Sequence, residues 1–331
     1  MLKVNYIFRN PDNGGFSIEE LFSNISSSIR SYRKVSTIEL PYKGAALGSI
    51  LKNLRYISRY KRNQIFHITG DVHYVALVPF RKFVLTIHDC HMFNNYSNLL
   101  KKVLIKYVWF YLPVTTASVV TVISEHTKKD LIRLVPWARR KIVVVPNPVN
   151  SLLERQPKNW STDRVRILHL GTKKNKNLEN TIRALAPLRC TLVIVGRLSE
   201  EHRVLLEKSG INYENYSNIP YSKIKDLYET SDVVNFVSLY EGFGMPIIEA
   251  QQVGRVVVTS PISPMKEVAG SGAAFAEPND IEDIRKTYVR LIQDSKWRNS
   301  LIENGFINVQ KYQLEAVGKE YEKIYAKLDV A

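Results

Sequence analysis

The sequence predicts an α/β protein of two domains, each with a parallel β-sheet covered by helices on both faces. Short apolar runs typical of buried strands alternate with helical segments, which is the pattern of parallel sheets with crossover helices. The length of 331 residues is sufficient for two hydrophobic cores. A polar stretch at 150–163, which contains Pro157, has the composition of a linker between them.

Twelve apolar runs are expected to form strands. In the first half they lie at 4–8, 37–40, 65–68, 83–87, 119–123 and 142–145. In the second half they lie at 165–170, 191–195, 211–213, 233–237, 256–259 and 273–275. From about residue 281 the chain is expected to be helical, and Val317, Tyr321 and Tyr325 at helical spacing indicate a packed face. We therefore expect domains at 1–150 and 151–310, followed by a C-terminal helix at 311–331.

The stretch SLYEGFGMPIIEAQ at 238–251 places two carboxylates at one strand-to-helix turn. Glu241 lies in the glycine-flanked loop, and Glu249 lies about one turn into a helix whose first turn contains Pro246. Open α/β sheets bind ligands at the carboxyl ends of their strands, and a helix N-terminus there offers N–H groups to an anion. The sequence therefore predicts a ligand site at this turn.

These residues resemble the Glu-x7-Glu signature of the retaining family 4 glycosyltransferases, which have the GT-B fold. Four further segments resemble family motifs in the same order: TIHD at 86–89, VISEHTKKDL at 122–131, KIVVVPNP at 141–148 and HLGTKKNKN at 169–177. Pro148 replaces the usual glycine of the third segment. The resemblance implies two Rossmann-like domains facing across a cleft, with the last helix returning to the first domain.

The resemblance also implies roles for the residues of this turn. Glu241 would contact the donor sugar's hydroxyls near the reacting carbon, and Glu249 would accept hydrogen bonds from the ribose hydroxyls, because carboxylates suit vicinal diols. The alternatives are an exposed loop glutamate and a first-turn glutamate favoured by the helix dipole. Backbone N–H groups that approach the sugar or phosphate are expected from Gly242, Phe243, Gly244 and Met245, although a helix-entry turn without a ligand has the same pattern.

Lys176 resembles the family lysine that neutralises the diphosphate as the glycosidic bond breaks. Preorganised positive charge in a dry site stabilises such a transition state. Many relatives have an arginine where this chain has Thr172, so a second charge is expected from Lys173, Lys174 or Arg197. The alternative for Lys176 is an exposed lysine in a basic loop.

Two further candidates lie in the first domain. Gly14 and Gly15 follow the first strand and precede a capping-box helix start at 17–20, so the chain there can approach a phosphate or sugar. His88 follows the strand 83–87 and is expected to donate a hydrogen bond to the sugar. The alternatives are a tight turn and a structural histidine. We expect Asp89 to brace this loop.

The two glutamates are not expected to act as a hydrolase pair, which needs an acid and a base or nucleophile across one bond. With a diphosphate leaving group no general acid is required. The family mechanism is same-face attack with retention, in which the departing phosphate helps to deprotonate the acceptor. The chain has no Asp-x-Asp and no zinc-like Cys and His spacing, so neither a metal nor another cofactor is expected.

The net charge of +16 is concentrated in the first domain. Residues 1–150 contain 22 Lys and Arg against 8 Asp and Glu, a net charge of +14, whereas the rest of the chain has +2. Basic residues mixed with aromatic and apolar ones at 30–34, 52–62 and 99–111 favour an anionic membrane surface, although solvated helix faces have similar patterns. No nucleic-acid module is recognised, so nucleic acid is not an expected partner.

Nothing in the sequence indicates secretion or membrane insertion. Residues 1–8 have the pattern of a strand and not of a signal peptide, and the apolar region 107–123 is interrupted by Pro113. Cys90 and Cys190 are too few for a disulfide scaffold, which fits a reducing compartment. We therefore expect a cytoplasmic protein associated peripherally with the inner face of the cell membrane.

The expected activity is that of a metal-independent retaining hexosyltransferase in cell-surface polysaccharide synthesis. It would move a sugar from a GDP- or UDP-sugar to a growing glycan, including a lipid-linked oligosaccharide, with the acceptor on the first domain and the donor on the second. One alternative is an epimerase, which would turn over a nucleotide sugar without acceptor, or a phosphorylase on the same scaffold. The other is a non-catalytic glycan- or glycolipid-binding module, which would bind without turnover. The sugar, the base and the linkage are not specified by these motifs.

Overall fold

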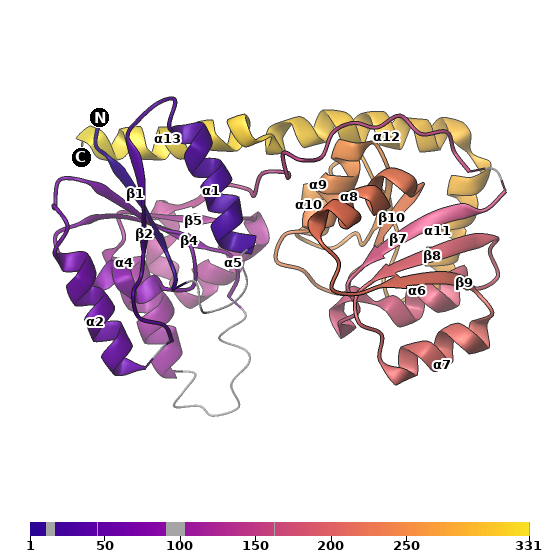
Figure 1. Cartoon of the computed structure of the whole chain (residues 1–331), viewed down its shortest axis with the longest axis horizontal. Helices are drawn as coiled ribbons and strands as arrows, with labels where there is room; N and C mark the ends of the chain where they lie inside the picture. The colour runs from indigo at the N-terminus through magenta and orange to yellow at the C-terminus, as the bar shows by residue number, and fades with distance from the viewer. Residues whose placement is uncertain (11–16, 45, 91–102, 162, 331) are drawn as a thin grey trace. The chain divides into compact units, whose positions relative to one another are not determined.

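The computed structural model describes residues 1–331 except 11–16, 45, 91–102, 162 and 331. The chain divides into two compact units (Figure 1). The first unit comprises Met1–Pro148 and Leu314–Ala331, and the second comprises Val149–Gln313. Each unit is an α/β layer structure, which confirms the predicted fold class.

The sheet of the first unit has six parallel strands within the described residues, in the order β2-β1-β3-β4-β5-β6. The strands are β1 (Val4–Phe8), β2 (Val35–Glu39), β3 (Ile65–Ile68), β4 (Lys82–Ile87), β5 (Val119–Val122) and β6 (Ile142–Val144). Because β2 and β3 lie on opposite sides of β1, the strand order reverses between β1 and β3. A reversal of this kind is where open α/β sheets bind ligands.

Helices cover both faces of this sheet, and each face has its own core. The described helices are α1 (Ser17–Ile29), α2 (Leu47–Ser58), η2 (His73–Leu77), η4 (Lys106–Tyr111), α4 (Leu112–Thr116), α5 (Glu125–Leu134) and η5 (Pro136–Lys141). Phe22 of α1 packs with Tyr6 and Val84 on one face. Phe110 of η4 packs with Phe66 and Leu85 on the other. Alternate residues of the strands thus fill the two cores, as expected for a doubly covered sheet.

The C-terminal helix α13 (Leu314–Val330) packs on the first unit beside α1, as the resemblance implied (Figure 1). Its buried Tyr325 hydroxyl lies 2.6 Å from Nδ1 of His67 and 2.9 Å from the hydroxyl of Tyr6. Arg33 forms ion pairs with Glu322 and Asp329 of the same helix. Both apolar burial and a buried polar network therefore hold α13 against the first unit.

The second unit also has a six-stranded parallel sheet within the described residues, in the order β12-β11-β10-β7-β8-β9. The strands are β7 (Val165–Leu170), β8 (Cys190–Val195), β9 (Asn212–Tyr216), β10 (Val233–Phe236), β11 (Val256–Thr259) and β12 (Ala274–Phe275). The order reverses between β7 and β10, which are neighbours in the sheet. This reversal marks the second ligand-binding position that the fold predicts.

The described helices of the second unit are α6 (Leu178–Leu185), α7 (Glu200–Ser209), α8 (Tyr221–Thr230), α9 (Met245–Val253), α10 (Met265–Ala269), α11 (Ile281–Gln293) and α12 (Ser295–Val309), with the short η6 (Lys174–Lys176) and η7 (Gln310–Tyr312). The helical region expected from residue 281 is interrupted twice. Asp294 caps α12 by accepting a hydrogen bond from the Trp297 N–H, which ends α11. Gln313 has extended backbone and separates η7 from α13.

Every predicted strand is found, and the bounds differ by at most a few residues. The largest difference is at β9, which continues to Tyr216 instead of ending at Tyr213. This strand lies at the edge of the sheet and is polar, so its apolar pattern was weak. The polar stretch predicted as a linker packs on the second unit, where the Gln156 N–H donates to the Val253 carbonyl. None of the described helices combines the length and apolar character that a membrane-spanning segment requires.

Candidate functional site

The candidate site lies where the strand order of the second unit reverses. The loop after β7 carries Lys176, and the loop after the neighbouring β10 carries Glu241. The two residues are 65 positions apart in the chain, yet the Lys176 Nζ lies 2.7 Å from the Glu241 Oε1. Both side chains are largely but not completely buried, with 21% and 13% exposed. The sheet order therefore brings together two of the residues that the sequence predicted as functional.

Four contacts hold this ion pair in place. The Lys176 ammonium lies 4.6 Å from the centre of the Phe236 ring, within the range of a cation–π interaction. The Asn175 side chain donates to the Tyr240 carbonyl at 3.1 Å and to the Glu241 Oε1 at 3.3 Å. The Leu239 N–H donates to the Asn175 carbonyl at 2.8 Å. The two loops are thus hydrogen-bonded into one rigid unit.

The conformation of the first loop depends on Gly171 and Asn177. Gly171 has φ +95°, and a Cβ there would lie 2.9 Å from the Lys176 Cγ. The aliphatic part of the Lys176 side chain therefore packs directly against Gly171, where any larger residue would collide with it. Asn177 has φ +62°, and its side chain donates to the Val237 carbonyl at 3.0 Å and to the Pro278 carbonyl at 2.6 Å.

The second loop enters α9 through Gly244, which has φ +113° and serves as the N-cap. Phe243 is buried, and its ring packs edge-to-face on Tyr312 at 5.9 Å, so it acts as an anchor of the turn. Met245 and Pro246 begin the helix, and the Ile247 N–H donates to the Gly244 carbonyl at 3.0 Å. The turn is the tight strand-to-helix connection that the glycines predicted, with Gly242 at its start.

Glu249 lies in α9 and is held by two tyrosines of α8. The Tyr228 hydroxyl donates to its Oε2 at 2.6 Å, and the Tyr221 hydroxyl donates to its Oε1 at 3.3 Å. Burial raises the pKa of the Glu249 carboxyl, and the two tyrosine hydrogen bonds oppose that shift because they favour the ionised form. Glu249 is therefore a partly buried, hydrogen-bonded acceptor and not a freely solvated first-turn glutamate.

A buried polar network begins beside the Lys176 loop. His169 at the end of β7 has its Nδ1 2.9 Å from the Asn235 amide nitrogen, and the Tyr288 hydroxyl donates to the Asn235 Oδ1 at 2.8 Å. Burial, with a smaller contribution from the Lys176 charge, lowers the pKa of His169 to about 3. The imidazole is therefore neutral at physiological pH and supports the loop without adding charge.

The structure does not select one of the three residues that the sequence offered for the second positive charge. Lys173, Lys174 and Arg197 are all exposed. The backbone carbonyl of Arg197 accepts a hydrogen bond from the Thr172 hydroxyl at 2.7 Å, which ties the loops after β7 and β8 together. None of the three side chains has a described contact with Glu241 or Lys176.

In the first unit, His88 follows β4 at the carboxyl edge of the sheet. Its Nε2 lies 2.8 Å from the Thr69 carbonyl, and because a carbonyl can only accept, Nε2 carries the hydrogen in this contact. Burial is the largest influence on His88 and lowers its pKa, so the ring is neutral at physiological pH. A neutral His88 in this geometry offers Nδ1 as an acceptor, and its expected hydrogen bond to the sugar stays a prediction. Gly14 and Gly15 lie outside the described residues.

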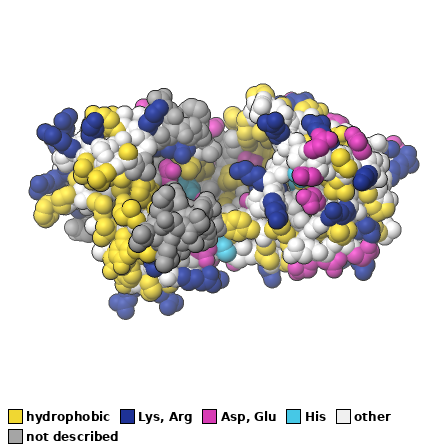
Figure 2. Space-filling view, turned by 90° about the horizontal axis from the view of Figure 1, so that it is seen from below, with side chains coloured by type: hydrophobic (Ala, Val, Ile, Leu, Met, Phe, Trp, Pro, Cys, Tyr) yellow, Lys and Arg dark blue, Asp and Glu magenta, His cyan; other side chains and the backbone are white. Residues whose placement is uncertain are grey.

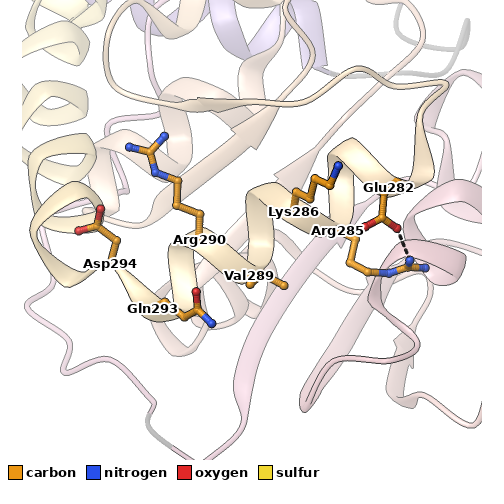
Figure 3. Close-up of a pocket in the computed structure, with 7 residues that line it drawn as sticks. All are labelled: Glu282, Arg285, Lys286, Val289, Arg290, Gln293 and Asp294. Carbon is orange, nitrogen blue, oxygen red and sulfur yellow. Dashed lines mark hydrogen bonds and ion pairs between the residues drawn. The ribbon is translucent and has the colours of Figure 1, made fainter.

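A groove along one face of α11 also belongs to the second unit (Figure 3). It is lined by Glu282, Arg285, Lys286, Val289, Arg290, Gln293 and Asp294. Its lining comes from α11 and from Asp294, which follows that helix, and Glu282 and Arg285 pair with each other. This groove does not include any residue of the candidate site.

Sequence reasoning missed the residues that support the site. Asn175 lies inside the segment 169–177, which resembles a family motif. The contact of its side chain with Glu241, however, depends on the pairing of β7 with β10. No pattern near Tyr228 in the sequence marks it as part of a site, because its position is that of an ordinary core residue of an amphipathic helix. Within the described parts of the chain, no three His, Cys, Asp or Glu side chains gather so as to hold a metal ion.

Comparison with family models assigns both halves of the chain. Residues 11–151 match the model of Glycosyltransferase Family 4, and residues 151–307 match that of Glycosyl transferases group 1. The chain is 26% identical over 226 residues to the O-antigen chain mannosyltransferase B of Escherichia coli, a match that covers 60% of this chain and 58% of that protein. It is 22% identical over 213 residues to the O-antigen chain mannosyltransferase RfbU of Salmonella typhimurium, covering 60% of this chain and 58% of that protein.

Solved structures share the whole fold. Anabaena Alr3699/HepE, crystallised with UDP and glucose, superposes with a TM-score of 0.79 at 17% identity and covers 99% of this chain and 100% of its own. WaaG, a glycosyltransferase involved in lipopolysaccharide biosynthesis, superposes with a TM-score of 0.69 at 15% identity, covering 97% of this chain and 99% of its own. The two consecutive family models and the two-sheet GT-B fold together make this chain a member of the family 4 glycosyltransferases.

Proposed function

We propose that this protein transfers a sugar from a nucleoside-diphosphate donor to a growing glycan, with retention of the anomeric configuration. The observation that carries the proposal is the Lys176–Glu241 pair at 2.7 Å, located where the strand order of the second unit reverses. A position of this kind binds a nucleotide in other doubly wound sheets. Glu249 lies eight residues further along the same turn and helix, as a second acceptor for donor hydroxyls.

The charges of the pair match those that develop when a glycosyl diphosphate is cleaved. The departing diphosphate gains negative charge, and a lysine ammonium held rigidly beside it stabilises that charge. The sugar ring gains positive charge near its anomeric carbon, beside which a carboxylate is favourable. Lys176 would therefore contact the diphosphate, and Glu241 the sugar. Gly242, Phe243, Gly244 and Met245 would present backbone N–H groups to the donor, and Arg197 is a candidate for the second cation.

The remaining parts of the reaction follow from this arrangement. The acceptor hydroxyl would attack the face that the diphosphate leaves and transfer its proton to a phosphate oxygen, so that no protein group need act as a general acid. We propose that the transfer requires no bound metal, with Lys176 supplying the positive charge. Mannosyl donors, as GDP- or UDP-sugars, are the first to test, because two curated relatives are named mannosyltransferases. His88, Gly14 and Gly15 of the first unit are further proposed contacts of the donor sugar.

The test is substitution of Glu241. We expect Glu241→Ala to abolish transfer to a lipid-linked or free glycan acceptor while the far-UV circular dichroism and melting temperature stay close to those of the wild type. Glu207→Ala, which removes an exposed carboxylate of α7 in the same unit, is the matched control and should stay active. Activity in EDTA tests the proposed metal independence. An active Glu241→Ala protein would end this assignment, and turnover of the sugar nucleotide without acceptor would indicate an epimerase instead.

We further propose that the first unit binds anionic membranes through an aromatic surface formed by Tyr107, Tyr111 and Trp137, together with the exposed Leu104 and Leu112 near them in the chain. The Tyr111 ring lies 5.0 Å from that of Tyr107 and 4.3 Å from that of Trp137, so the surface is continuous across η4 and η5. Exposed Arg139 and Arg140 follow Trp137. Figure 2 shows hydrophobic side chains gathered on one face of the first unit, with lysine and arginine side chains around them. Aromatic rings beside basic groups suit the interface of an anionic bilayer.

Sedimentation with lipid vesicles tests this surface. We expect the wild type to sediment with vesicles that contain phosphatidylglycerol at low salt, and not with pure phosphatidylcholine. The double variant Tyr107→Ser/Trp137→Ser should lose this binding. Ile307→Ser, which removes a side chain that is 71% exposed in the second unit, should keep it. Wild-type sedimentation by the double variant would show that the aromatic surface is not the membrane contact.

A further inference from the structure

The second glutamate of the signature is held by α8, the helix that precedes β10 in the chain. Tyr228 reaches Glu249 Oε2 at 2.6 Å, which is the length of a strong charge-assisted O–H···O⁻ hydrogen bond. Tyr221 reaches the other oxygen at 3.3 Å, beyond the usual range for such a bond. The two tyrosines lie seven positions apart, two turns of one helix, so both side chains point from the same face of α8.

The two tyrosines differ in how firmly they are fixed. Tyr228 has no exposed surface, and its backbone carbonyl accepts a hydrogen bond from the buried Arg255 at 3.1 Å. Arg255 also binds the Glu229 carbonyl at 2.9 Å, which secures the last turn of α8. Tyr221 is the first residue of α8 and is only half-buried. Tyr228 is therefore a fixed donor, whereas the Tyr221 hydroxyl makes a long contact at the accessible end of the helix.

A carboxylate can accept about four hydrogen bonds, so the Tyr228 bond leaves capacity for two ribose hydroxyls. We propose that Tyr228 is a positioning residue: it orients the Glu249 carboxyl for the ribose diol of the donor, and a ribose hydroxyl replaces the Tyr221 hydroxyl on Oε1. This inference rests on the proposed role of Glu249. Glu249 would bind the ribose, and its orientation would depend on a buried residue that does not touch the donor.

The electrostatics of the site support this role. Burial raises the pKa of Glu249, and the Tyr228 and Tyr221 hydrogen bonds act in the opposite direction. These two tyrosines of α8 are the titratable groups of the described chain that act on this carboxyl. Loss of the Tyr228 hydroxyl would therefore raise the pKa of Glu249 further, and the protonated carboxyl would be a weaker acceptor for a diol.

The experiment measures nucleotide affinity by isothermal titration calorimetry. The probes are UDP and GDP with their 2′-deoxy analogues, and the proteins are the wild type, Tyr228→Phe, Tyr221→Phe, Glu249→Gln and the double variant Tyr228→Phe/Glu249→Gln. We expect Tyr228→Phe to weaken binding of the preferred ribonucleotide roughly tenfold to a hundredfold. The loss of a hydrogen bond to a charged group changes a dissociation constant by about that factor. The 2′-deoxy analogue should lose much less, and Tyr221→Phe should weaken binding far less than Tyr228→Phe, because a ribose hydroxyl takes the place of the Tyr221 hydroxyl.

The double variant tests whether Tyr228 acts through Glu249. We expect it to bind as weakly as Glu249→Gln alone, because residues that act as one unit are not additive. The affinity of Tyr228→Phe should also fall at a higher pH than that of the wild type as the solution is acidified. If Tyr228 contributes to stability alone, Tyr228→Phe should lower the melting temperature. It should then change neither the preference for ribose nor the pH midpoint, which is the pH at which half of the affinity is lost.

The outcomes separate the two levels of the proposal. If Glu249→Gln loses affinity and Tyr228→Phe does not, or if their effects add, Tyr228 has no positioning role and the proposed function stands. If Glu249→Gln keeps full affinity and ribose preference, the proposed role of Glu249 falls as well. Should Tyr228→Phe fail to fold, 3-fluorotyrosine at position 228 replaces it. As a stronger donor it should lower the pH midpoint, and an unchanged midpoint would overturn the inference.

Discussion

The Lys176 loop makes a quantitative prediction, because a Cβ at Gly171 would be caught between a strained backbone and the lysine stem. Gly171 has φ +95°, and the added methyl of Gly171→Ala would lie 2.9 to 3.3 Å from three carbons of Lys176. The backbone conformation costs a non-glycine residue about 1–2 kcal/mol. Displacement of the lysine stem would also move its Nζ from the Glu241 Oε1, which lies 2.7 Å away. Misplacement by about 1 Å costs on the order of a hundredfold in rate.

The control is Gly210→Ala at the end of α7, where φ is +66° but nothing lies within 4 Å of the added Cβ. Both variants should lose a similar free energy of unfolding in urea titrations followed by circular dichroism. Gly171→Ala alone should lose affinity for a nucleoside diphosphate, measured by calorimetry, and transfer activity. Equal stability losses with wild-type nucleotide affinity in both variants would refute the reasoning that Gly171 exists to make room for Lys176.

Other predictions concern the framework of the two units. Tyr325→Phe leaves the His67 Nδ1 and the Tyr6 hydroxyl without their partner, so the free energy of unfolding should fall by about 1–3 kcal/mol in urea titrations, and an unchanged value would contradict the buried network. Burial lowers the pKa of His67 to about 3, so the unfolded chain, with a pKa near 6.5, binds this proton more readily. This contribution to stability is present above pH 6.5 and is lost as the pH falls below it, by about 1.4 kcal/mol per pH unit. Urea midpoints from pH 7 to pH 5 should therefore fall more steeply for the wild type than for His67→Gln. A Cβ in Gly272→Ala would meet the backbone of Gly305, so the melting temperature of the second unit should drop, and a neutral substitution would show that α12 can shift freely.

Much of the fold followed from local patterns. Each predicted strand was found, because buried parallel strands are continuous apolar runs and the turns between them are marked by glycine, proline and polar residues. The hydrogen-bonding state of His88 could not be predicted from the sequence, since its contact with the Thr69 carbonyl depends on which strand lies beside β4. The break at Asp294 was missed because a single aspartate cap within a helical region resembles a surface residue.

The sequence by itself determined the order of the elements and the spacing of Glu241 and Glu249, because both depend on residues close together in the chain. Only the tertiary structure decided which side chains meet. Lys176 and Glu241 are 65 positions apart, Tyr228 and Glu249 are 21 apart, and His67 and Tyr325 are 258 apart. The physical reason is that contacts of this kind depend on which strands are neighbours and on the directions in which buried side chains leave their helices. Neither property is encoded in a local run of residues.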